Sequence, residues 1–240
     1  HRAARLYAQY DLSKDAYLAD LVVNDLDIHQ FLPKDSLFDV SIKLHADGEG
    51  LDFFAPETRF NVKGTVDQLQ YTTYRLAGYD FTATLEKHQL DASLLARNSA
   101  MEVQAHLDGK LRPNDVAAHL QVQVPKFDWQ VMQLMDMPFR TSHQFNVTFV
   151  SDLKKKYEVN ASMTDTSVKA PKKTFQTKDL YVGFTTSADS TKAYMRAGDL
   201  DVNFEGRGYV ETLLAQVDAF TSRANEQWTS KTINQEELKT

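Results

Sequence analysis

Apolar and polar residues alternate along most of this chain, and this period of two limits the possible folds more than any other feature. The stretch VSIKLHA at 40–46 is typical, with every second residue apolar and Ser, Lys and His between them. The same alternation recurs at 60–66, 79–85, 90–96, 101–107, 116–124, 145–149, 157–163, 180–184 and 200–204. Because successive side chains of a strand point to opposite faces, the pattern predicts strands with one apolar and one polar face.

Short polar connectors separate the alternating stretches and contain residues that favour turns. Examples are ADGEG at 46–50, LARNSA at 95–100, LDGKLRPND at 107–115 and TSADSTK at 186–192. The close spacing of the strands fits successive antiparallel hairpins. The sequence therefore predicts an all-β fold, a curved antiparallel sheet of about 11–12 strands.

One longer helix is expected at the C-terminal end, over residues 209–228. Its apolar residues follow the i, i+3, i+4, i+7 spacing of an amphipathic helix. They are Val210, Leu213, Leu214, Val217 and Phe220. The polar stretch 229–240 is predicted to be a frayed tail or a linker.

The two halves of the chain follow a similar order. LDIHQFLP at 26–33 and FDWQVMQLMDMP at 127–138 each resemble short helical turns that open near an aspartate and end at a proline. An alternating strand follows each of them, and the later strands also correspond in order. This predicts two β repeats of roughly 100 residues, at 1–110 and 111–208, although any meander of short strands also aligns loosely with itself.

The residues needed for catalysis or metal binding form no known motif. The chain has no cysteine, its seven histidines include no HExxH pair, and its glycines form no GxGxxG, P-loop or GxSxG motif. The aspartate pairs in DLDIH and DLDVN lack the other ligands of a calcium loop. We therefore expect no enzyme, no metal site and no cofactor; a hydrolase or lectin would need a convergent polar pocket that the alternation leaves no place for.

Charge and hydropathy exclude further classes of protein. A net charge of −6, from 27 basic and 33 acidic residues, is unsuited to tracking nucleic-acid phosphates. No apolar run approaches the roughly 20 residues that span a bilayer. The chain begins at His1, without a signal peptide and inside an expected strand, so we expect an excised fragment of a longer protein.

An extended sheet with one apolar face needs something to cover that face. The sheet could close on itself as a sandwich or barrel, or it could curl into a trough that stays open to apolar ligands. Many apolar positions hold alanine, which packs a core thinly but leaves room for acyl chains. These alanines are Ala46, Ala83, Ala92, Ala96, Ala105, Ala118 and Ala161.

Three stretches resemble the AsmA/TamB family of Gram-negative envelope proteins. They are LVVNDLDIHQFLPKDSLFDVSIKLHADGEG at 21–50, VKGTVDQLQYTTYRLAGYDFTATL at 62–85 and LDASLLARNSAMEVQAHLDGKL at 90–111. The resemblance extends over about residues 5–208 and consists of degenerate β repeats rather than fixed functional residues. It implies a β-taco, a curled sheet with an apolar interior, in a periplasmic protein anchored in the inner membrane. The expected helix at 209–228 departs from this repeat.

The resemblance also implies a function. The family is implicated in moving phospholipid between membranes, and its TamB members in assembling outer-membrane proteins with a β-barrel partner. Acyl chains would be the ligand here, and the barrel would be reached through parts of the parent chain outside this sequence. The residues expected to line the groove are Val40, Ile42, Leu44, Val62, Phe81, Leu85, Leu94, Val103, Leu107, Leu120, Val122, Val147, Phe149, Val159 and Val182.

The alternative function is a structural or protein-binding β module with a closed core. In that case the same residues pack against one another, and exposed strand edges recruit partner chains. The state of the sheet interior, open or closed, separates the two hypotheses.

Overall fold

The computed structural model describes residues 3–27, 29, 37–71 and 74–230, which form fifteen strands and one helix. The elements are β1 (Ala3–Asp11), β2 (Ala16–Asp27), β3 (Leu37–Glu49), β4 (Arg59–Tyr71), β5 (Tyr74–Leu76), β6 (Tyr79–Glu86), β7 (Gln89–Arg97), β8 (Met101–Arg112), β9 (Asp115–Asp128), β10 (Arg140–Ser151), β11 (Tyr157–Ala170), β12 (Lys173–Gln176), β13 (Leu180–Thr186), β14 (Ser190–Ala197), β15 (Leu200–Arg207) and α1 (Val210–Ser230).

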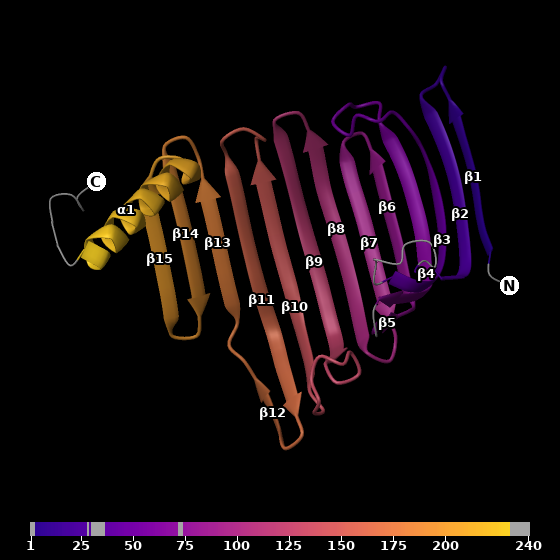
Figure 1. Ribbon diagram of the computed structural model, residues 1–240. Coiled ribbons are helices and arrows are strands. Elements are labelled where there is room, and N and C mark those ends of the chain that lie inside the picture. The colour runs from indigo at the N-terminus through magenta and orange to yellow at the C-terminus, as the bar shows by residue number, and fades with distance from the viewer. Residues whose placement is uncertain (1–2, 28, 30–36, 72–73, 231–240) are drawn as a thin grey trace.

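All strands belong to one antiparallel sheet, ordered as they are in the chain (Figure 1). The short β5 and β12 are additions that pair only with β4 and β11. β1 forms one edge and β15 the other, and among the described residues no pairing joins them. The prediction of a curved antiparallel sheet with a C-terminal helix is confirmed, and the sheet is open rather than closed.

The expected count of 11–12 strands was too low, for a local reason. β5 and β12, with three and four residues, are too short to display alternation. β14 was missed because its first three residues end the stretch TSADSTK, which looks like a turn. Its apolar positions carry only Ala193, Met195 and Ala197, between polar or aromatic neighbours.

The strand register aligns the apolar positions into three rows that cross the whole sheet. Each row takes one residue from every strand except β5 and β12, and residues paired across strands share a face. The first row is Leu6, Leu21, Leu44, Gly64, Phe81, Leu94, Ala105, Val122, Phe145, Met163, Leu180, Ala197 and Leu200. The second is Ala8, Ala19, Ala46, Val62, Ala83, Ala92, Leu107, Leu120, Val147, Ala161, Val182, Met195 and Val202. The third is Tyr10, Tyr17, Gly48, Phe60, Leu85, Leu90, Gly109, Ala118, Phe149, Val159, Phe184, Ala193 and Phe204. We call the side of the sheet that carries these rows the apolar face.

The intervening residues form a row of opposite character on the other side, the polar face. That row is Tyr7, Asp20, His45, Lys63, Thr82, Ser93, His106, Gln121, Asn146, Ser162, Tyr181, Arg196 and Asp201. A slip of one residue in any strand would exchange the two faces, so the alternation also fixes the register.

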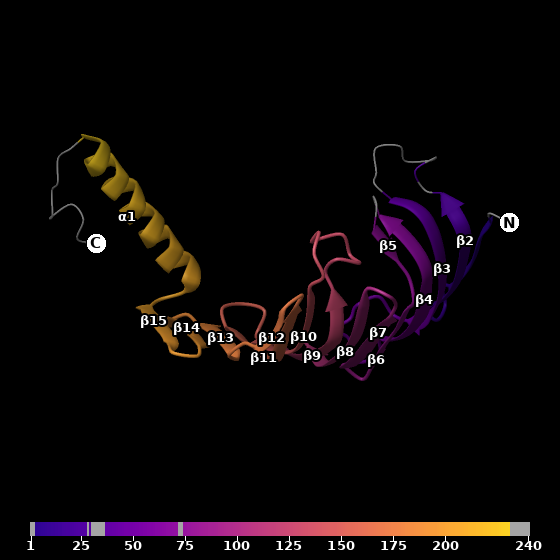
Figure 2. The ribbon, with the colours of Figure 1, turned by 90° about the horizontal axis from the view of Figure 1, so that it is seen from below.

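The sheet is twisted and curved, and its apolar face lies on the concave side. Figure 2 shows β2–β5 rising at one side of the hollow and α1 at the other. The first residue of α1, Val210, donates its N–H to Thr186 Oγ1 at 3.1 Å. Thr186 shares a face with Phe184 and Val182, which precede it by two and four positions in β13. The helix therefore leaves from the apolar face and rises at one side of the hollow (Figure 2).

The order of strands from β2 to β8 recurs from β9 to β15. In each series three strands are followed by a short side strand, β5 or β12, and then by three more. The register shifts match in part: extra residues bulge β2 and β4 on either side of β3, and β9 and β11 on either side of β10, while β3 has a further shift between Leu37 and Val40 that β10 lacks. The sheet nevertheless runs on without a break, and the predicted division at residues 110 and 111 falls inside β8 and stays a prediction.

Very little of the chain is buried. Its solvent-accessible surface is 16187 Å², whereas a compact monomer of this mass exposes about 10,900 Å². The buried hydrophobic residues are few and several of them are small: Val23, Val40, Leu85, Ala96, Ala100, Met101, Val116, Val124 and Val168. In the described part of the chain, the sheet is therefore a single layer whose hydrophobic face has no covering layer.

The two predicted short helical turns have different outcomes. Most of 26–33 lies outside the described residues. Residues 127–138 contain consecutive turns rather than a regular helix, with one helix-like bond from the N–H of Met132 to the carbonyl of Asp128, at 3.0 Å. The aspartate does open this segment, because its Oδ1 accepts the N–H of Val131 at 3.0 Å as an N-cap would.

Candidate functional site

All fifteen residues expected to line a groove lie on the apolar face. Twelve belong to the three rows, and Val40, Ile42 and Val103 lie two or four positions earlier on the same faces of β3 and β8. Their exposure differs. Leu85 is 1% exposed and Val40 5%, so neighbouring side chains cover these two. Leu94 and Val182 are more than a third exposed. Whether any of them contacts lipid stays a prediction.

Sequence reasoning missed the ends of the apolar face. β15 contributes Leu200, Val202 and Phe204, each about half exposed, and β1 contributes the exposed Leu6. The alternation at 200–204 was recognised in the sequence, and it could have assigned these three residues of β15 to the apolar face. A strand was expected at the start of the chain, but its residues were not assigned to the groove, since two of its inward positions are Ala4 and Ala8.

Aromatic rings fill the space beside two of the three glycines in the rows, Gly48 and Gly64, whereas Gly109 lies against Ala117 and Ala118. A methyl group at Gly64 would overlap the ring of Phe81, so the ring lies across the backbone of β4. Gly48 accommodates the Tyr17 ring in the same way. These contacts keep the apolar face continuous where a row has no side chain.

One histidine, His143, lies on the apolar face, and its ring is uncharged there. His143 precedes Phe145 by two positions in β10, and their rings meet edge to face with centroids 4.6 Å apart. Burial lowers the pKa of His143, because desolvation disfavours the imidazolium. The ring is therefore neutral at pH 7, as an apolar surface requires.

The polar face carries several solvent-exposed ion pairs. His45 Nδ1 lies 2.7 Å from Asp20, which raises the pKa of His45, and its Nε2 lies 3.2 Å from Asp47. Lys43 and Asp67 form a pair at 2.8 Å. Such exposed pairs contribute little to stability, but they keep this face hydrated.

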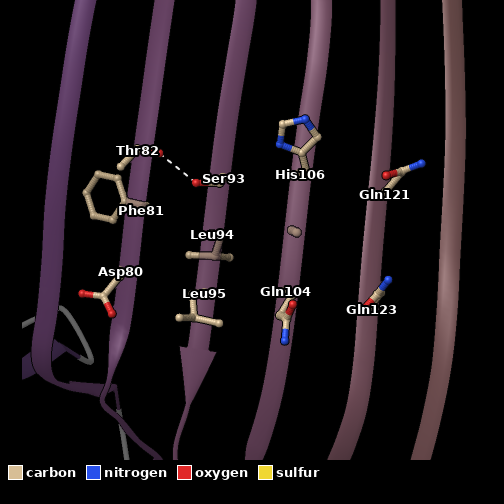
Figure 3. A pocket seen from close by; sticks show the side chains of 11 residues that line it. Asp80, Phe81, Thr82, Ser93, Leu94, Leu95, Gln104, His106, Gln121 and Gln123 are labelled. Atoms are coloured by element: carbon tan, nitrogen blue, oxygen red, sulfur yellow. Dashed lines mark hydrogen bonds between the residues drawn. The ribbon is translucent and has the colours of Figure 1, made fainter.

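A shallow depression of about 440 Å³ lies on the polar face over β6–β9 (Figure 3). Its lining mixes polar and apolar residues: Gln104, Gln121 and Gln123 lie on one side, and Leu95 is among the apolar residues that line the rest. The Ser93 hydroxyl is hydrogen-bonded to that of Thr82 at 2.7 Å, and His106 lies 3.4 Å from Asp91 instead of activating the serine. The arrangement provides no nucleophile paired with a base.

Within residues 3–27, 29, 37–71 and 74–230, no group of three or more His, Asp or Glu side chains could hold a metal ion. None of the helices described is long and apolar enough to cross a membrane.

The loop between β9 and β10, residues 129–139, is fastened at its base. Asp128, almost fully buried, accepts the Arg140 Nε–H at 2.6 Å. Trp129 donates its indole N–H to Thr141 at 3.0 Å and packs edge to face against Phe127 and Phe139, at centroid distances of 5.1 and 6.1 Å. These contacts give the loop a fixed base.

We expect acid to loosen this base. Burial pushes the pKa of Asp128 upward, but the Val131 N–H and the Arg140 guanidinium outweigh it and hold the pKa below its usual value. The anchor is therefore fully present above the unfolded value, near pH 4, and is lost as pH falls through the lower folded value. Trp129 emission in a Trp228→Phe background should shift below about pH 4. In Asp128→Asn most of that transition should disappear; an unchanged transition would show that other carboxylates cause it.

Comparisons of the chain with protein-family models, with curated proteins and with solved structures find no match.

Proposed function

We propose that the apolar face holds the acyl chains of phospholipids, in a non-enzymatic segment of an AsmA/TamB-like envelope protein. The observation that carries the proposal is the set of three unbroken apolar rows on the concave side of an open sheet. Exposed apolar surface of this extent marks an interaction site. Acyl chains suit it because none of the three rows carries a charged side chain that would select another ligand.

The energetics favour hydrocarbon without strong head-group selection. Each methylene moved from water onto the face contributes about 0.8 kcal/mol. The rows contain no charged residue, so head groups would stay in solvent near the ends of the strands. A periplasmic location and an inner-membrane anchor elsewhere in the parent chain belong to the same proposal.

Native mass spectrometry of the purified chain, with lipid extraction from the same sample, tests the proposal. We expect adducts with phospholipid masses and the matching lipids in the extract. A lipid-free mass from a cooperatively folded chain would contradict it.

A second candidate function rests on the two free edges. Within the described part of the chain, the outer edges of β1 and β15 have no strand partner, and exposed apolar side chains such as Leu6 and Phe204 lie beside them. Natural sheets normally protect such edges, and an unprotected edge can pair with a strand of another protein. Assembly of outer-membrane proteins would use this property. This alternative would be supported if the purified chain carried no lipid and bound extended peptides.

A further inference from the structure

Exposed apolar side chains gather on the loop 129–139. They are Val131, Leu134, Met135 and Met137, from 36% exposed at Met135 to 51% at Met137. The base of this loop is fixed by the contacts of Asp128 and Trp129 described above. The loop therefore presents these side chains to solvent from a defined place at one end of the sheet.

A basic hairpin lies beside this loop. Residues 166–178, between Asp165 and Asp179, include no acidic residue but four lysines, Lys169, Lys172, Lys173 and Lys178. Phe175 projects from the hairpin, 42% exposed, with the Lys173 ammonium 5.9 Å from its ring.

The loop and the hairpin are neighbours. Arg140, which ends the loop, is paired in register with Lys169 of β11, and β12 pairs with the same end of β11. Figure 1 shows both elements at the same end of the sheet, with the β12 hairpin projecting furthest. We call residues 129–139 and 169–178 together the basic rim; it contains four lysines and one acidic residue, Asp136.

We propose that the basic rim docks on the surface of an anionic lipid bilayer. Aliphatic side chains beside lysines are the combination that binds the interfacial region of such membranes. The apolar residues of the loop would enter that region, while the four lysines lie against anionic head groups. This proposal does not depend on the apolar face holding lipid, although a docked rim would bring that face close to a source of lipid.

The opposite end of the sheet offers a matched control. The turn between β10 and β11 carries Lys154, Lys155 and Lys156 and the exposed Leu153. Asp152 of the same turn accepts the backbone N–H groups of all three residues, which fixes the shape of the turn. General attraction between a positive patch and a negative membrane would involve this turn as much as the basic rim.

Flotation with vesicles tests the proposal on the whole chain. Vesicles of phosphatidylcholine with about a third phosphatidylglycerol should bind the chain, and pure phosphatidylcholine should not. Raised salt should weaken binding. Since each lysine near an anionic surface changes binding about fivefold, Lys169→Gln/Lys172→Gln/Lys173→Gln should lower the partition coefficient about 100-fold. The exposed pair Leu134→Gln/Met137→Gln should lower it about tenfold or more.

The control variants decide what the result means. Lys154→Gln/Lys155→Gln/Lys156→Gln should bind within about twofold of the unaltered chain. Equal loss in this control, binding to neutral vesicles alone, or no vesicle binding would overturn the proposal. Val122→Asp, which changes the apolar face, should still float. A variant that loses extracted lipid but still floats therefore separates failure of the lipid-holding function from failure of docking.

Discussion

Replacing Val122 by Asp is expected to remove most of the lipid that co-purifies with this chain, while replacing its neighbour Gln121 by Asp leaves the lipid content unchanged. The two residues are adjacent in β9 and lie on opposite faces. Val122 sits in the first apolar row, paired with Ala105 and Phe145. Gln121 is exposed on the polar face, opposite His106 and Asn146.

The size of the effect follows from the cost of placing a carboxylate against hydrocarbon. An ionised group without a partner costs several kcal/mol in an apolar environment, so acyl chains would leave the centre of the face. We expect the molar ratio of lipid to protein, measured by phosphate analysis of the extract, to fall about tenfold. Circular dichroism of both variants should retain the β signal.

Two outcomes would count against lipid on this face. Equal lipid content in the two variants would place the lipid elsewhere. Unfolding of Val122→Asp would indicate a packed core, and the more exposed Leu94, changed to Asp, then provides the second test. If that variant also unfolds, the face is covered in solution by protein rather than by lipid.

The assignment of residues to faces was predictable because alternation is a local property. Leu44, Phe81 and Leu94 come from three strands, yet each was assigned to the apolar side from its own neighbours alone. Antiparallel pairing then places them opposite one another or in the same row, because a register that buried polar residues would be unfavourable.

The alternation of apolar and polar residues could not predict whether the sheet closes into a barrel. A closed barrel and an open trough need the same alternation in every strand, and they differ in whether β1 and β15 pair. That pairing depends on twist and curvature summed over the whole sheet, to which turns and bulges contribute. The sequence could not predict the basic rim either, because residues 129–139 and 169–178 become neighbours only through the register of β10 with β11.

The sequence also could not predict how deeply each residue of the apolar face is buried. Leu85 and Leu94 are the same residue type on neighbouring strands, but one is 1% exposed and the other 36%. Leu85 is paired with Phe60 and Leu90, and only Glu86 separates it from the tight turn at Lys87 and His88. Leu94 is paired with Ala105, which covers little of it, and with Phe81, whose ring lies against Gly64 on the other side.

This contrast predicts the largest single loss of stability among the residues of the face. Leu85→Ala should lower the free energy of unfolding by about 2–4 kcal/mol, because it leaves a cavity among side chains that have few other buried neighbours. Leu94→Ala, in chain stripped of lipid by detergent exchange, should cost less than about 1 kcal/mol. Urea unfolding followed by circular dichroism measures both, with the midpoint rather than the slope expected to move.

Repeating the pair of measurements with lipid present connects stability to the proposed ligand. Bound acyl chains would cover Leu94 and add to the stability of the folded state in proportion to occupancy. The cost of Leu94→Ala should then rise, because the substitution also removes a lipid contact, whereas the cost of Leu85→Ala should stay constant, since Leu85 is already buried by protein. If lipid changes neither cost, or changes that of Leu85→Ala alone, Leu94 is not part of a lipid-binding surface.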